Sequence, residues 1–280
     1  MDKSTPPPSL PHLSAPPPDY DPAPPSLPDP DEILPPAILT LHGRFIYPVQ
    51  PCGTPSSNPL YQLSRAIHAQ GRATESIDFQ RLDYRVHNSD GLVGPSVTHR
   101  ARDVYTLLHR PPMFDYVPLD ARIAPPTTNL KRNMGQLKVL VSLWAPYLPG
   151  KKKFRVVRVP PEDDQAIWRL RGDKEKLKEK NWETVFQLSR EHDKEWCWHD
   201  SEGRLLARQM EQVRKAGETE ETEQEHQLRI LVPLPRKEMD ALVALWCLWM
   251  WHLHVEATPV KKTLDDVRRI MAAAPGVWRY

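Results

Sequence analysis

The sequence lacks the short motifs that identify many enzymes and ion-binding loops. It contains no glycine-rich phosphate loop, no GxSxG or HExxH motif and no EF-hand loop. Each of these motifs holds backbone amides, a nucleophile or metal ligands at the spacing that its chemistry requires. We therefore predict a non-catalytic protein that carries no cofactor and no metal ion.

Cysteine is scarce, and the three residues Cys52, Cys197 and Cys247 form no CxxC pair. An odd number of widely spaced cysteines favours reduced thiols in an intracellular compartment. The amino terminus also lacks the basic and apolar regions of a secretory signal peptide. We expect an intracellular, cytoplasmic protein, with a peripheral membrane or nuclear location as open alternatives.

Neither sign of charge dominates, because 38 Lys and Arg residues nearly balance 36 Asp and Glu residues. The resulting net charge of +2 provides no general attraction to nucleic acid. We therefore expect no nucleic-acid partner, and we expect the chain to be a monomer.

No apolar run is long enough to cross a membrane as a helix. The longest run, residues 241–251, is well short of the roughly 20 residues that a membrane span needs. Lys237, Glu238 and Asp240 lie within a turn of its start. Burial in a protein core is therefore the favoured interpretation, and a transmembrane helix is the alternative.

The sequence does contain a helix, residues 236–254, that is apolar on every side. Between Met239 and Leu253 only Asp240 and His252 are polar. Such a helix must be surrounded, and we expect it to run through the middle of a β-barrel. The side chains expected to fill the interior are Leu242, Leu245, Trp246, Trp249 and Leu253. His252 and His254 face different sides and are expected to cap the helix and stabilise its negative end.

Proline is concentrated at the amino terminus, where residues 1–36 hold 14 of the 32 prolines. Such a segment buries too little apolar surface to fold, so we predict a disordered tail that is partly polyproline II. Pro17, Pro18 and Tyr20 fit a PPxY pattern, which WW domains bind between aromatic side chains. The expected partner is a WW-domain protein, and a chance match is the alternative.

Alternating apolar and polar residues predict strands between the tail and the helix. The predicted strands are residues 37–47, 60–68, 76–86, 103–109, 114–123, 154–159, 166–170, 182–188 and 228–234, with a hairpin at 195–208. Gly203 can supply the positive φ of that hairpin's turn. Residues 137–144 fit either a strand or a buried helix, and Trp196 and Trp198 should both point into the core. About ten to twelve strands should close into a barrel or pack as a sandwich.

This order of elements resembles the Tubby C-terminal-like superfamily, which groups the tubby domain, the phospholipid scramblases and the LURP-one-related proteins. Three segments carry the resemblance to fungal members: Pro-Leu-Tyr-Gln-Leu-Ser at 59–64, Trp-His-Asp-Ser-Glu-Gly at 198–203 and Asp-Ala-Leu-Val-Ala-Leu-Trp at 240–246. The resemblance implies a mainly β fold, a closed antiparallel barrel of about twelve strands around the helix. The resemblance covers about residues 37–256, which are expected to form the barrel with its helix, and the proline-rich tail at 1–36 precedes them. Residues 257–280 form an extension with a short amphipathic helix that opens at Thr263.

The resemblance also indicates a function. Tubby domains bind phosphoinositide head groups through basic residues, so we expect a binding or scaffold module that contacts anionic lipid. Candidate basic residues are Lys131, Arg132, Lys151, Lys152 and Lys153, with a solvated turn as the alternative for the triplet. The scramblases imply a second possibility, a lipid-active or lipid-carrying protein.

Overall fold

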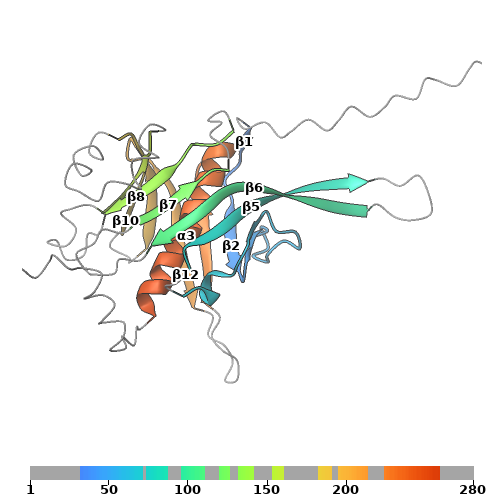
Figure 1. Ribbon diagram of the computed structural model, residues 1–280. Helices are drawn as coiled ribbons and strands as arrows, with labels where there is room; N and C mark the ends of the chain where they lie inside the picture. The colour runs from blue at the N-terminus through green and yellow to red at the C-terminus, as the bar shows by residue number, and fades with distance from the viewer. Residues whose placement is uncertain are drawn as a thin grey trace, which may run out of the picture.

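Twelve strands form a closed antiparallel barrel around a long helix (Figure 1). This computed structural model confirms the predicted fold class. It describes residues 32–71, 74–87, 96–110, 120–126, 132–141, 153–160, 182–190, 195–213 and 224–258.

Each barrel strand pairs with the strand that precedes it and the strand that follows it, and β13 closes the ring on β2. The barrel strands are β2 (Ile38–His42), β3 (Phe45–Pro48), β4 (Tyr61–Leu63), β5 (Ser76–His87), β6 (Ser96–Arg110), β7 (Asp120–Ala124), β8 (Leu137–Val141), β9 (Lys153–Arg158), β10 (Thr184–Arg190), β11 (Trp196–Asp200), β12 (Leu205–Val213) and β13 (Gln224–Ile230). Of the two alternatives for residues 137–144, the structure shows a strand over Leu137–Val141, and residues 142–144 lie outside the described residues. The predicted strand at 166–170 and the predicted helix after Thr263 lie outside the described residues.

The prediction of one strand over residues 37–47 is wrong, because the chain turns back between β2 and β3. Gly43 has a φ of 59° at this turn, in the region that glycine adopts most easily. Leu41 and Ile46 pair across the hairpin and both point into the barrel. Residues 60–68 also differ from the prediction, since β4 is short and a 3₁₀ turn, η1 (Ile67–Ala69), follows it.

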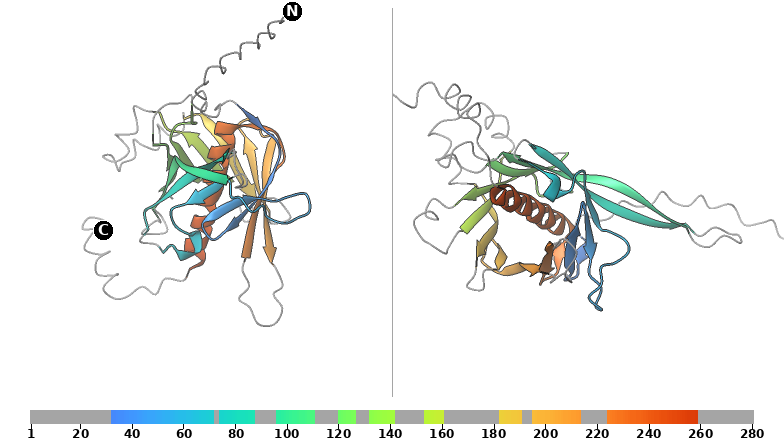
Figure 2. Two further views of the ribbon diagram at one scale, coloured as in Figure 1. Left: turned by 90° about the vertical axis from the view of Figure 1, so that its right-hand side faces the viewer. Right: turned by 90° about the horizontal axis from the view of Figure 1, so that it is seen from below.

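β5 and β6 are longer than predicted and form a two-stranded ribbon that extends beyond the barrel wall (Figures 1 and 2). β6 begins at Ser96, well before the predicted start at residue 103. The twelve register pairs between the strands run from Ser76 opposite Leu108 to His87 opposite Ser96. The outer part of this ribbon is therefore a surface that the prediction omitted.

Backbone structure also begins earlier than the predicted tail boundary. β1 (Ile33–Leu34) pairs with β14 (Leu234–Pro235), the two residues that lead into the helix. Beside this pair, Arg236 donates from Nε to Glu32 at 2.9 Å. The end of the predicted disordered segment is thus held against the start of the helix.

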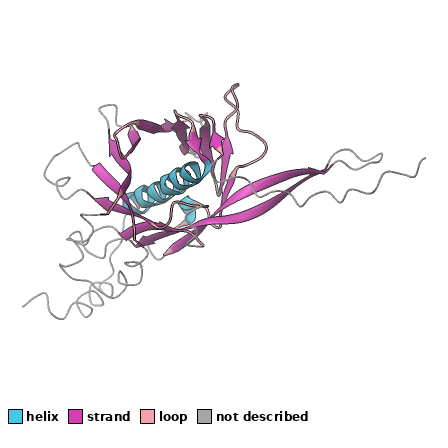
Figure 3. Cartoon of the chain, turned by 90° about the horizontal axis from the view of Figure 1, so that it is seen from above, coloured by secondary structure: helices cyan, strands magenta, loops and turns pink. Residues whose placement is uncertain are grey.

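The helix α3 (Arg236–Ala257) is enclosed by the strands, as the view from above in Figure 3 shows. Every residue from Met239 to His252 is buried. Four of the five predicted interior side chains are at most 4% exposed, namely Leu242, Leu245, Trp246 and Trp249. The fifth, Leu253, is only partly buried. The apolar character of the sequence thus reflects enclosure by protein.

Aromatic side chains fill the space between α3 and the far wall of the barrel. α3 lies closer to β6 and β7 than to β11 and β12 (Figure 2). The rings of Phe154 and Trp196 lie 4.5 Å and 4.8 Å from that of Trp249. Trp196 and Trp198 both point inward, as predicted. The cavity left beside Trp249 measures about 10 Å³, which is room for about one water molecule.

Candidate functional site

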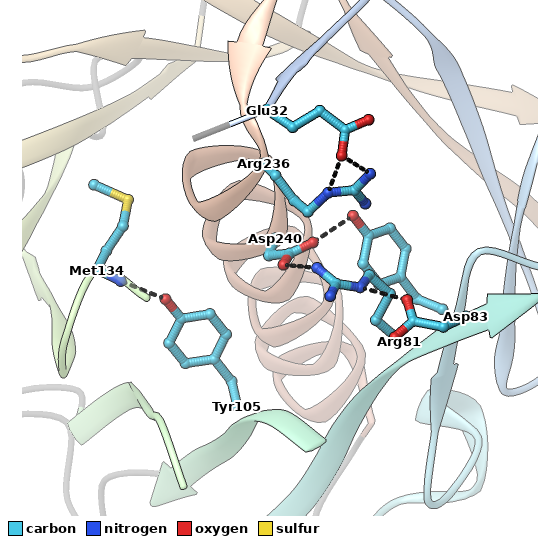
Figure 4. Close-up of polar contacts among 8 residues, drawn as sticks. Glu32, Arg81, Asp83, Tyr105, Met134, Arg236 and Asp240 are labelled. Atoms are coloured by element: carbon cyan, nitrogen blue, oxygen red, sulfur yellow. Dashed lines mark hydrogen bonds and ion pairs between the residues drawn. The ribbon is translucent and has the colours of Figure 1, made fainter. Parts of the chain in front are cut away.

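Among the residues that the structure describes, the one buried carboxylate belongs to Asp240. Asp240 is 3% exposed and projects from an early turn of α3. The Tyr61 hydroxyl donates to Asp240 Oδ1 at 2.8 Å, and Arg81 Nη1 donates to Asp240 Oδ2 at 2.8 Å (Figure 4). Arg81 Nε also donates to Asp83 Oδ1 at 3.0 Å. Both oxygens of the buried carboxylate therefore have a partner.

Strand pairing explains why these groups meet. Tyr61 on β4 and Arg81 on β5 are directly opposite each other in the ladder. Opposite residues project from the same face of a sheet, and here that face is the inner one. The first turns of α3 pass beside this part of the wall, so Asp240 reaches both side chains.

Burial controls the ionisation of this network. Burial raises the pKa of Asp240, although the charge of Arg81 and the hydrogen bond from Tyr61 act to lower it. Burial and the neighbouring Asp240 raise the pKa of Tyr61 well above its ordinary value, so the phenol remains a donor. Burial alone would lower the pKa of Arg81, but Asp240 and Asp83 outweigh it and the pKa is raised.

The network holds α3 in place and offers no surface for a reaction. Tyr61, Arg81 and Asp240 are each at most 7% exposed, so a substrate could not reach their polar atoms. A second buried pair lies further along α3, where His109 Nε2 and His252 Nδ1 are 3.2 Å apart. His252 Nε2 also lies 3.3 Å from Glu256 Oε1.

The prediction that His252 caps the helix is wrong. The ring of His252 is 6% exposed and faces the barrel wall at His109. The helix end is capped by Thr258, whose backbone N–H and hydroxyl both donate to the carbonyl of His254. Across the described part of the chain, no three His, Cys, Asp or Glu side chains come together as metal ligands.

The structure places only part of the predicted anion-binding set. Arg132 is exposed, and Lys153 begins β9. Lys131, Lys151, Lys152 and the PPxY residues Pro17, Pro18 and Tyr20 lie outside the described residues.

Arg132 lies near Arg102 of β6, which the prediction missed together with Arg100. Partial burial lowers the pKa of Arg102, and the charges of Arg81, Arg132 and Arg100 lower it further, although Asp83 acts to raise it. Arg100 and Arg102 are two residues apart on one strand, which places their side chains on one face. That alternation was present in the sequence, but the predicted strand began only at residue 103.

Comparison of the chain with protein-family models, curated proteins and solved structures finds no match. Among the helices of the described residues, α3 included, none combines the length and apolar character that crossing a membrane requires. None of the three cysteines forms a disulfide bond, and Cys52 is exposed whereas Cys197 and Cys247 are buried.

Proposed function

We propose that this protein is a non-catalytic binding module that recognises its partners on the outside of the barrel. The observation that carries this proposal is the filled interior. Trp198, Trp246 and Trp251 are each at most 1% exposed inside the ring of strands, and the adjoining cavity of about 10 Å³ has no room for a metabolite. Recognition is therefore assigned to the outer surface and to the loops.

We also propose membership of the Tubby C-terminal-like superfamily. A closed barrel of twelve antiparallel strands around a carboxy-terminal helix is the arrangement that the resemblance implies. By analogy with tubby domains, the proposed ligand is a phosphoinositide head group, contacted by Arg132 together with Lys131 and Lys151 to Lys153. The exposure of Arg132 supports its place in this set.

Co-sedimentation of the full chain with vesicles tests the lipid ligand. Phosphatidylcholine vesicles with and without a phosphoinositide would be compared at low and high salt. The proposal expects salt-sensitive binding that requires the phosphoinositide and is lost in a Lys151→Glu, Lys152→Glu variant. Binding that is unchanged in this variant would remove the lysines from the site.

The amino-terminal tail is proposed to recruit a WW-domain protein through Pro17, Pro18 and Tyr20. Immobilised WW domains should retain the full chain and should fail to retain a Tyr20→Ala variant. Equal retention of both proteins would show that the PPxY match is a chance one.

One observation favours the alternative of a lipid-active or lipid-carrying barrel. Gln209 is 2% exposed and points into the barrel, yet no group in the described part of the chain bonds either polar atom of its amide. The same holds for the indole N–H groups of Trp198, Trp246, Trp249 and Trp251. Each buried unpaired group costs about 1–3 kcal/mol, so together these groups lower the stability of the closed barrel. Hydrogen exchange of α3 that increases with anionic vesicles would support opening, and full protection would exclude it.

A further inference from the structure

The ribbon of β5 and β6 has two chemically different faces. In the register of the two strands, Arg81 lies opposite Arg102, Asp83 lies opposite Arg100, and Arg85 lies opposite Thr98. Directly opposite residues share a face, as do alternate residues along a strand. One face therefore collects all of these arginines, and the other carries the pairs Leu82 with Ala101 and Tyr84 with His99. We call Arg85, Arg100 and Arg102 the arginine face.

The arginine face carries an excess of positive charge. Its one carboxylate among these pairs, Asp83, already accepts a hydrogen bond from Arg81 at 3.0 Å. Asp103 lies on the opposite face, where it accepts a hydrogen bond from Gln80. The face therefore keeps three positive charges that the ribbon itself does not neutralise.

The guanidinium groups of the arginine face have no partner within the described residues. No side-chain hydrogen bond or ion pair joins another described residue to Arg85, Arg100, Arg102 or the neighbouring Arg132. Four arginines elsewhere in the barrel are paired with carboxylates: Arg158 with Glu183, Arg204 with Asp200, Arg208 with Glu195 and Arg236 with Glu32. Other exposed arginines, such as Arg44, Arg65 and Arg229, lie outside the ribbon, and the arginine face gathers three unpaired arginines on one face of two neighbouring strands.

This concentration is costly in the free protein. Like charges directly opposite in a ladder destabilise it, and Arg81 and Arg102 form such a pair. Arg100 and Arg132 add to the repulsion at Arg102. A ligand with several negative charges would relieve this repulsion, and the planar guanidinium group can bind a phosphate through two hydrogen bonds.

The opposite face anchors the ribbon and leaves the arginine face free. The Tyr84 hydroxyl donates to the carbonyl of Pro59 at 2.8 Å. Next to it, the backbone N–H of Leu82 donates to the carbonyl of Leu60 at 2.9 Å. These bonds tie the ribbon to residues 59–60 of the barrel, so the strands that carry the arginines are anchored before any ligand binds.

We propose that the arginine face binds the phosphate backbone of duplex DNA, with the ribbon lying along the major groove. A two-stranded β-ribbon fits that groove in B-form DNA. The ribbon stands away from the barrel (Figures 1 and 2), and Arg100 and Arg102 are spaced by about 7 Å along it. A lipid surface is planar and favours a broad basic patch, whereas these cations follow the length of a narrow arm. The near-zero net charge of the chain conceals this local segregation.

The test is fluorescence anisotropy of a short labelled DNA duplex titrated with the full chain over a range of NaCl concentrations. An Arg85→Ala, Arg100→Ala, Arg102→Ala variant should bind about tenfold more weakly or worse at low salt. The affinity of this variant should also depend less on salt. The negative slope of log K against log salt should become shallower by about 0.9 for each lost phosphate contact. A matched control is Arg44→Ala, Arg65→Ala, Arg229→Ala, which removes three exposed arginines outside the ribbon and should bind like the parent protein.

Several outcomes would overturn the proposal. The proposal is wrong if the parent protein does not bind duplex DNA, or if the two triple variants lose the same amount of affinity. It is also wrong if the ribbon variant has the same salt slope as the parent protein. Preference for duplex RNA would exclude a B-form groove as the ligand. Vesicles of phosphatidylcholine with phosphatidylserine form a separate arm, and binding to them alone, lost in the ribbon variant, would assign the arginines to lipid. This proposal does not depend on the phosphoinositide proposal, whose variants leave the ribbon intact.

Discussion

The carboxylate of Asp240 receives the Tyr61 hydroxyl and the Arg81 guanidinium from adjacent strands. Removing one partner of a buried ion pair leaves an uncompensated charge and costs about 3–5 kcal/mol. We expect Asp240→Ala to lower the free energy of unfolding in urea by about 3 kcal/mol, because Asp83 still bonds Arg81. Asp83→Ala is the control, since its side chain is 30% exposed and its loss should cost less than about 1 kcal/mol.

A double variant separates lost charge pairing from lost packing. Replacing both partners, as Arg81→Met with Asp240→Leu, removes the desolvation cost of both charges. This variant should be more stable than Asp240→Ala alone. If the two are equally unstable, the network contributes through the shape of its side chains and not through their charge.

The three thiols should differ sharply in reactivity. Hydrogen bonding to the side chain of Thr54, with further help from its backbone, lowers the pKa of Cys52, while burial raises the pKa of Cys247. A lowered pKa means that the reactive thiolate is present at lower pH. Iodoacetamide at neutral pH should therefore label Cys52 in the folded protein, and Cys197 and Cys247 only in urea. Mass spectrometry after timed quenching measures this, and early labelling of Cys247 would contradict the enclosure of α3.

At the scale of elements, the turns were partly predictable from the sequence. Gly203 was expected to adopt a positive φ in the hairpin between β11 and β12, and its φ is 86°. The turn at Gly43 was missed because apolar alternation continues through residues 37–47 and conceals the reversal. The partners of Asp240 could not be predicted from the sequence, for a related reason. The sequence marked Asp240 as exceptional, but Tyr61 and Arg81 meet it only through strand register, which no local pattern encodes.

Glycine substitutions test the two turns. At both Gly43 and Gly203 an added methyl group meets nothing within 4 Å, so the cost is that of the left-handed backbone, about 1–2 kcal/mol. We expect Gly43→Ala and Gly203→Ala each to lower the free energy of unfolding by that amount. Gly71→Ala is the control, since Gly71 is equally unobstructed and lacks a positive φ. A neutral effect at Gly203 would mean that the turn relaxes into another conformation.

The same hairpin should contribute to acid sensitivity. Partial burial would raise the pKa of Asp200, but hydrogen bonds from the backbone and side chain of Arg204 and from the backbone N–H of Glu202 lower it overall. A folded-state pKa below the unfolded value stabilises the fold above the unfolded pKa. That contribution is lost as pH falls through the folded pKa. Stability curves of the parent and Asp200→Asn proteins should therefore converge in acid, and a constant difference would contradict this assignment.

At the scale of the whole molecule, the last described element forms the centre of the core. The inward-facing residues of the strands, such as Phe186 and Trp198, form one hydrophobic core together with the buried residues of α3. Burial of the large apolar side chains of α3 contributes on the order of 20 kcal/mol gross, at about 1.5–3 kcal/mol each. Net stability of a domain is only about 5–15 kcal/mol. The barrel therefore depends on α3 for its existence, and a chain without that helix has no alternative core.

Truncation tests this dependence directly. A chain that ends at Pro235 should show no cooperative unfolding transition and should bind a hydrophobic dye, because its inward-facing strand residues lose the apolar surface of α3. A chain that ends at Thr258 keeps all of α3 and should unfold cooperatively. Adding a peptide of residues 236–258 to the shorter chain should restore part of the transition, since the helix supplies the missing surface. A cooperative transition in the chain that ends at Pro235 would show that the strands can collapse onto one another, and that enclosure of the helix follows barrel formation instead of causing it.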